Sequence, residues 1–198
     1  GRDVARHTFF ALYALQHRGQ EAAGIVTCDG AVAHVHKGMG LVAEIFSQDE
    51  LAKLPGRMAI GHVRYSTAGS SNLRDAQPFL ANMGRSVVAI AHNGNLTNAR
   101  AIRAELEGHG SIFQSTMDSE VFVHLFARAL ERDQEARAIE GLEQVVDGVR
   151  VERGERVLLV CGDEHDHRRG FAFEAPQHLE AIEHWHLHVE EEQLGVLL

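Results

Sequence analysis

Hydrophobic residues recur along the chain at two kinds of spacing, which predict helices alternating with pairs of short strands. Residues 4–16 have apolar side chains at helical spacing, from Val4 to Leu15. Apolar runs predict strands at residues 23–27, 32–36, 58–63 and 86–91. Capping residues predict helices at residues 47–54, 97–107 and 118–131, and residues 135–146 support another helix. Asp29-Gly30, between the first two strands, is typical of a hairpin. Strands joined in this way between helices favour an α+β layered domain over a doubly wound parallel sheet.

The composition fits one globular domain and excludes some partners. The chain has 198 residues, of which 44% are hydrophobic and 24% are charged, enough for a sizeable core. Its formal net charge of -9 argues against binding a nucleic-acid backbone, which needs clustered Lys and Arg. No apolar run approaches the roughly 20 residues that span a bilayer, and the first residues do not form a secretory signal. We therefore expect a cytoplasmic protein that binds neither nucleic acid nor membrane.

The two cysteines, Cys28 and Cys161, each close an apolar β-like run. Without a secretory signal, the sequence favours two reduced, half-buried thiols over a disulfide. Neither thiol has a sequence neighbour that would lower its pKa and make it a nucleophile.

Arg64 follows the predicted strand at residues 58–63 and is the first candidate binding residue. A guanidinium held at a strand end can grip a carboxylate through two parallel hydrogen bonds, a geometry that lysine cannot match. The alternative is an ordinary ion pair at the surface or at the rim of the core. Arg64 taken by itself does not decide between the two.

The pair Asn93-Gly94 follows the predicted strand at residues 86–91. A side-chain amide beside a backbone N–H can stabilise an oxyanion, and glycine allows close approach. An isolated Asn-Gly pair is more often a hairpin turn. Here, however, a helix cap at Thr97 or Asn98 follows instead of a second strand.

Asp118 and Gly19 are ordinary residues when taken singly. The Asp118 carboxylate could receive an ammonium group, but an aspartate at a helix start is commonly a cap. Gly19, in H-R-G-Q, could simply end a helix. Together with Arg64 and Asn93-Gly94, however, they would suit a small zwitterion.

Four segments carry these candidates: L-Q-H-R-G-Q-E-A-A-G-I (residues 15–25), G-H-V-R-Y-S-T-A-G-S-S-N (61–72), A-H-N-G-N-L (91–96) and T-M-D-S-E-V (116–121). With H-K-G-M-G-L-V and A-Q-P-F, they resemble the amino-terminal glutaminase domains of the amidophosphoribosyltransferase family over residues 12–148. Other class II glutamine amidotransferases share only R-G, G-H-x-R, H-N-G and D-x-E. The resemblance implies the N-terminal-nucleophile hydrolase fold, a four-layer α/β/β/α sandwich with two antiparallel sheets.

The resemblance also implies a glutamine site and an enzyme. The expected site residues are Arg64 for the α-carboxylate, Asp118 for the α-ammonium group, the Asn93 side chain and Gly94 N–H as the oxyanion hole, and Gly19 and Thr67 as pocket lining. Family members hydrolyse the glutamine amide to glutamate and ammonia through a thioester on an amino-terminal cysteine, whose α-amine is the base. A phosphoribosyltransferase domain uses the ammonia to make 5-phosphoribosylamine, the opening step of purine synthesis.

The sequence departs from the family pattern at both ends. Family members begin with C-G-[IV]-x-G-[IV], whereas this chain begins with G-R-D-V-A-R-H, and Cys28 could not replace a nucleophile that carries its own α-amine. After the glutaminase domain at residues 1–148, we expect a divergent tail at residues 149–198 that completes part of the sheet or results from a frame shift. We expect this chain to lack the phosphoribosyltransferase domain. We therefore expect a fold incomplete at both ends that binds glutamine without hydrolysing it.

Three hypotheses follow for the whole chain. It is a fragment of a working amidophosphoribosyltransferase, a non-catalytic glutamine-binding domain, or a metal-binding or interaction module that uses its His-rich tail. In that tail, His184, His186 and His188 alternate and could bind Zn or Cu from one face of a strand, although a solvent-facing strand edge is the simpler interpretation. The resemblance implies no cofactor here, because Mg²⁺ and phosphoribosyl pyrophosphate belong with the missing domain. Family members are homo-oligomers.

Overall fold

The computed structural model describes residues 3–30, 32–65, 72–83, 86–94, 96–132, 156–162 and 172–174. The chain divides into two compact units, Gly1–His92 with Glu155–Leu198, and Asn93–Gly154. The first unit contains α1 (Val4–Ala14), η1 (Gln16–Arg18), β1 (Ala22–Cys28), β2 (Ala33–Met39), α2 (Val42–Ile45), α3 (Gln48–Ala52), β3 (Met58–Arg64), η2 (Leu73–Asp75), β4 (Phe79–Met83), β5 (Ser86–His92), β6 (Arg156–Gly162) and β7 (Ala172–Glu174). The second contains α4 (Ala99–Gly108) and α5 (Glu120–Arg132).

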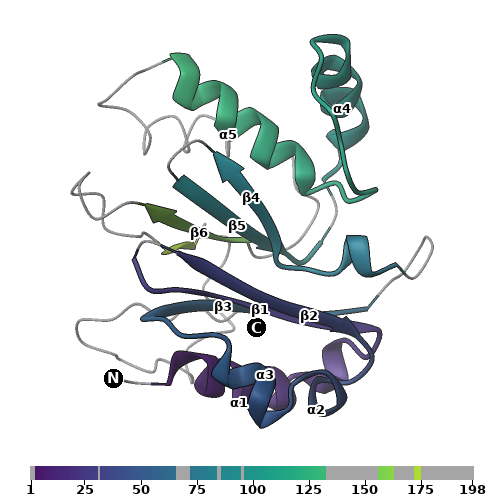
Figure 1. Cartoon of the computed structure of the whole chain (residues 1–198). Coiled ribbons are helices and arrows are strands. Elements are labelled where there is room, and N and C mark those ends of the chain that lie inside the picture. The colour runs from purple at the N-terminus through teal and green to yellow at the C-terminus, as the bar shows by residue number, and fades with distance from the viewer. Residues whose placement is uncertain are drawn as a thin grey trace. The chain divides into compact units, whose positions relative to one another are not determined.

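The strands of the first unit form two sheets, in the orders β2-β1-β3 and β4-β5-β6-β7. Every neighbouring pair is antiparallel. Figure 1 shows α1, α2 and α3 along one side of the first sheet and the second sheet along its other side. The antiparallel, layered arrangement confirms the predicted α+β class.

Strand β1 lies at the centre of these layers, and all seven of its residues are buried. Its side chains alternate between two faces, as a strand requires. Ile25 packs in a cluster with Leu12 of α1, and Val26 packs in another cluster with Ala89 of β5. The continuous apolar run of β1 is therefore explained by cover on both of its faces.

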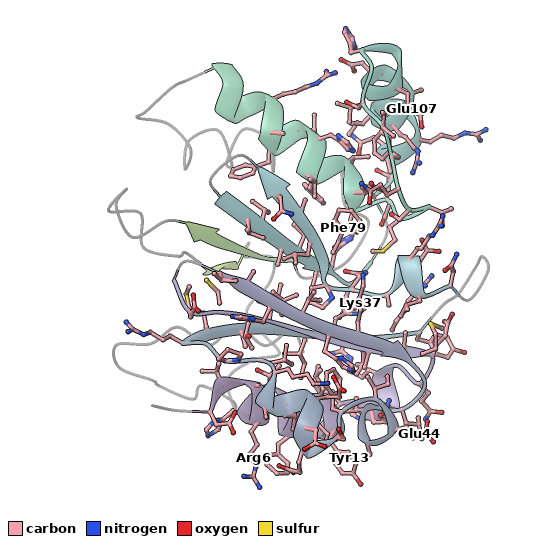
Figure 2. All side chains as sticks on the ribbon, in the orientation of Figure 1. Arg6, Tyr13, Lys37, Glu44, Phe79 and Glu107 are labelled. Carbon is pink, nitrogen blue, oxygen red and sulfur yellow. The ribbon has the colours of Figure 1, made fainter. Side chains whose placement is uncertain are left out.

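Helix α1 follows the amphipathic pattern predicted for residues 4–16. The Asp3 carboxylate accepts a hydrogen bond from the Arg6 N–H at 3.0 Å and so caps its first turn. Val4, Ala5, Thr8 and Leu12 form its buried face. Arg6 and Tyr13 point away from the sheet (Figure 2).

Most predicted elements are present with small shifts at their ends. The predicted cap at Ser47 is confirmed, since its Oγ accepts the Glu50 N–H at 3.2 Å. Helix α5 begins at Glu120 instead of 118. The prediction omitted α2 and β4, which are short and lack a clear period. The helix predicted at residues 135–146 lies outside the described residues.

Residues 149–198, which the sequence predicts to be a divergent tail, contain β6 and β7. Arg156–Gly162 pairs with the whole of β5, and three residues of β7 pair with β6. The His-rich part of this segment lies outside the described residues, and the domain boundary after residue 148 stays a prediction.

The expectation of two reduced thiols is wrong for Cys28, which is fully buried and disulfide-bonded. The other cysteine of the chain, Cys161, lies opposite Val87 in the second sheet, and Val87 packs against the cluster that contains Cys28. Face-to-face packing of the two sheets thus brings together strands that are distant in sequence. Among the described residues, no helix is both long enough and apolar enough to span a bilayer.

Gly24 in β1 allows a very close approach between β1 and the segment before β4. A Cβ atom on Gly24 would lie 2.2 Å from the Gln77 carbonyl oxygen and 2.9 Å from the Lys37 Cβ. The adjoining residues 75–78 are all buried. A side chain at position 24 would therefore force backbone to move.

We expect Gly24→Ala to destabilise the chain by about 1–3 kcal/mol, because the added methyl group overpacks against backbone. The matched control is Gly108→Ala at the end of α4, where a Cβ meets nothing within 4 Å. That change is expected to be neutral or stabilising by up to about 1 kcal/mol. Urea unfolding followed by circular dichroism measures both variants, and equal stabilities would contradict the packing argument.

Candidate functional site

Arg64 stands at the end of a buried strand with one part of its side chain unsatisfied. Five consecutive residues of β3 before it are buried, while Arg64 itself is half-buried. Its Nη1 atom is buried and has no hydrogen-bond partner among the residues that the structure describes. A buried guanidinium nitrogen without a partner is costly, so an anionic ligand would relieve the cost.

Gly19 packs directly against the backbone of Arg64. A Cβ atom at Gly19 would lie 2.6 Å from the Arg64 carbonyl carbon and 2.8 Å from its nitrogen. Its φ of -168° is ordinary extended backbone, so a left-handed helix end does not explain this glycine. Close approach explains it instead, and the structure brings Gly19 and the backbone of Arg64 together.

Gln16 fixes the position of Gly19, a role that the sequence did not reveal. Its Nε2 donates to the Gly19 carbonyl oxygen, and its Oε1 accepts from the Val42 N–H at 2.7 Å. The side chain therefore ties the turn at residues 16–19 to the start of α2. Thr67, the other expected lining residue, lies outside the described residues.

Asn93 and Gly94 begin the second unit directly after β5. Gly94 has a φ of +116°, a backbone conformation that favours glycine. The chain then continues to α4 at Ala99, so the Asn-Gly pair is not the two-residue hairpin that is its commonest alternative. The residue preceding the pair, His92, has its backbone bonded to the side chain of Gln77.

The Asp118 carboxylate anchors the loop that follows Gly94. Its Oδ2 accepts a hydrogen bond from the Leu96 N–H at 2.7 Å. The helix that Asp118 precedes begins two residues later, at Glu120. Asp118 therefore contacts the backbone two residues after Gly94, and its second oxygen has lone pairs that can accept further hydrogen bonds.

Glu120 organises the loop in front of Asp118. The carboxylate is 2% exposed and accepts hydrogen bonds from the Gln114 N–H at 2.8 Å, the Ser115 N–H at 2.9 Å and the Ser115 hydroxyl at 2.7 Å. Arg103 of α4 donates to the Ser115 carbonyl oxygen at 3.0 Å. In D-S-E, the acidic residue two places after Asp118 thus has a structural role that the sequence pattern did not distinguish.

Lys37 and Asp75 add charge inside the first unit. The Lys37 ammonium donates to the Ala76 carbonyl oxygen at 2.7 Å. Burial lowers the pKa of Lys37, and the Asp75 carboxylate acts in the opposite direction. Within the described ranges, no group of three His, Cys, Asp or Glu side chains could hold a metal ion.

The chain is similar in sequence to a known protein family and to several characterised proteins. A family model described as a glutamine amidotransferase domain matches residues 47–141. The chain is 48% identical over 143 residues to the chloroplastic amidophosphoribosyltransferase of Vigna aconitifolia, covering 72% of this chain and 30% of that protein. It is 50% identical over 123 residues to the amidophosphoribosyltransferase of Bacillus subtilis, covering 62% and 26%. The chain thus spans less than a third of the length of these relatives.

A solved structure agrees with the sequence comparison. The glutamine phosphoribosylpyrophosphate amidotransferase from B. subtilis, complexed with ADP and GMP, has a TM-score of 0.67 and 38% identity, covering 80% of this chain and 32% of that one. This similarity confirms the predicted N-terminal-nucleophile hydrolase fold. The chain therefore contains a glutamine amidotransferase domain homologous to the one in amidophosphoribosyltransferases.

Proposed function

We propose that this chain binds L-glutamine and forms the glutaminase part of an amidophosphoribosyltransferase. The observation that carries the proposal is the buried Arg64 Nη1, which has no hydrogen-bond partner among the described residues, at a position where the glutamine amidotransferase resemblance expects a carboxylate receptor. Arg64 binds the α-carboxylate through two hydrogen bonds. Asp118 binds the α-ammonium group with a carboxylate that is already held by Leu96.

The Asn93 side chain and the Gly94 N–H stabilise the oxyanion that forms when the glutamine amide is attacked. Removing one such donor in other enzymes costs about 100- to 1,000-fold in rate, because the donors act on charge that develops in the transition state. The φ of +116° at Gly94 supports this role, since a residue with a Cβ would strain the same turn.

We also propose a reaction for the whole enzyme, on the basis of its amidophosphoribosyltransferase relatives. Glutamine is hydrolysed to glutamate and ammonia, and the ammonia reacts with phosphoribosyl pyrophosphate to give 5-phosphoribosylamine. Phosphoribosyl pyrophosphate, and Mg²⁺ with it, would bind a phosphoribosyltransferase domain instead of the residues described above. Homo-oligomeric assembly and a cytoplasmic location stay predictions.

We expect Arg64→Lys to weaken glutamine binding by about 10- to 100-fold, because lysine keeps the charge but loses the paired hydrogen bonds. Isothermal titration calorimetry with L-glutamine measures the effect. Arg57→Lys is the matched control, since Arg57 is exposed just before β3. An Arg64→Lys variant with the parent affinity would contradict the proposal that Arg64 binds the α-carboxylate through two hydrogen bonds.

Asp118→Asn separates the structural role of this residue from its binding role. The amide oxygen of asparagine can still accept the Leu96 N–H, so we expect a stability loss below about 1 kcal/mol. The negative charge is lost, so glutamine affinity should fall about tenfold or more. Affinity for 4-carbamoylbutanoate, which lacks the ammonium group, should hardly change. Equal losses for the two ligands would count against an ammonium contact.

The 198-residue polypeptide should bind glutamine without releasing ammonia above background. Both cysteines are internal, so neither has an α-amine of its own, and Cys28 is buried and disulfide-bonded. A coupled glutamate dehydrogenase assay measures ammonia, and the variant with Cys28→Ser and Cys161→Ser is the control. Release of ammonia by that double variant would show that hydrolysis needs neither cysteine and would contradict the expectation.

A further inference from the structure

We propose that Gln77 is a positioning residue that sets the geometry of the oxyanion turn at Asn93-Gly94. The inference rests on the proposed function, because it assigns a support for that site. Gln77 lies in A-Q-P-F, a segment that contains none of the expected glutamine-binding residues. Its side chain contacts the backbone of His92, the last residue of β5, and Asn93 follows directly.

The side chain of Gln77 continues the hydrogen-bond ladder between β4 and β5. Phe79 is paired with Ile90, and in the same antiparallel register position 77 falls opposite His92. The Gln77 Nε2 donates to the His92 carbonyl oxygen at 3.0 Å, and the His92 N–H donates to Gln77 Oε1 at 2.6 Å. The carboxamide thus supplies the donor and acceptor that a paired strand residue would supply from its backbone.

Gln77 is itself held in a rigid setting. It is 8% exposed, and its carbonyl oxygen lies where Gly24 leaves room in β1. The preceding carbonyl, that of Ala76, accepts the Lys37 ammonium at 2.7 Å. Because two neighbouring strands of the first sheet, β1 and β2, thus fix the segment around Gln77, its carboxamide can impose a fixed position on His92.

The downstream side of the same turn has its own anchor. Asp118 Oδ2 accepts the Leu96 N–H at 2.7 Å. Within the second unit, Asp118 therefore holds the residue two places after Gly94. Oxyanion donors must lie within hydrogen-bond distance of the developing charge, so small displacements of Asn93 and Gly94 would cost rate or affinity.

An amide is required at position 77 for a reason other than filling space. An apolar side chain of similar size would fill the same volume but would leave the buried His92 N–H and C=O unpaired. A carboxylate could accept the N–H but would repel the C=O. Only a group with one donor and one acceptor satisfies both, and a protonated carboxyl has the same pattern as the carboxamide.

The test compares L-glutamine with L-norvaline, which has the same α-groups and chain length but no side-chain amide. Calorimetric titration of Gln77→Met should show glutamine affinity lowered about tenfold or more, while norvaline affinity stays within about twofold of the parent. Gln48→Met, at an exposed position in α3, is the matched control and should retain the parent selectivity.

Gln77→Glu provides a second, reversible test in one protein. At pH 8 the introduced carboxylate should reduce the preference for glutamine over norvaline, as Gln77→Met does. At pH 5 the buried carboxyl is protonated beside the His92 carbonyl, because burial and that carbonyl raise its pKa, and the preference should return. This comparison stands even if Gln77→Met fails to fold.

Three outcomes would overturn the inference. Parent-like selectivity in both variants would show that Gln77 does not position the turn, and equal losses for the two ligands would show that it only stabilises the fold. A parent chain without preference for glutamine over norvaline would instead overturn the proposed function, and the inference with it.

Discussion

The burial of β1 on both faces is the constraint on which the rest of the first unit depends. Its seven residues are fully covered, by α1 on one side and by the second sheet on the other. A strand in this position cannot tolerate a change of register, since a one-residue slip would exchange its two packed faces. Its neighbours β2 and β3 are therefore fixed in register, and Arg64 at the end of β3 is fixed with them, opposite Ala22.

Two glycines, which have no side chain, allow close packing around this sheet. Gly24 admits the Gln77 carbonyl oxygen to β1, and Gly19 admits the turn after α1 to the backbone of Arg64. Both glycines are explained by contact with backbone and neither by positive φ. The sheet thus holds two loops in place through close packing, although neither loop forms a strand of the sheet.

The sequence predicted what depends on local pattern or on whole family segments. The amphipathic spacing of α1, the cap at Ser47 and most strands were accessible, and the family segments indicated the glutamine amidotransferase domain. Long-range pairing was not accessible: β6 joins the second sheet from the predicted divergent tail, and Cys28 forms a disulfide although its sequence context favours a thiol. The contact between Asp118 and Leu96 was hidden for the same reason.

Three polar side chains support the candidate site without being expected to contact the ligand. They belong to Gln16, Gln77 and Glu120. Each satisfies backbone groups of a loop, or of the strand residue next to a loop, that carries or adjoins a candidate binding residue. Loops lack the regular partners of a ladder or helix, so their buried N–H and C=O groups need side chains instead. A site built from loops therefore needs a set of amides and carboxylates behind it, and replacing one of these supports should move the binding groups without removing any of them.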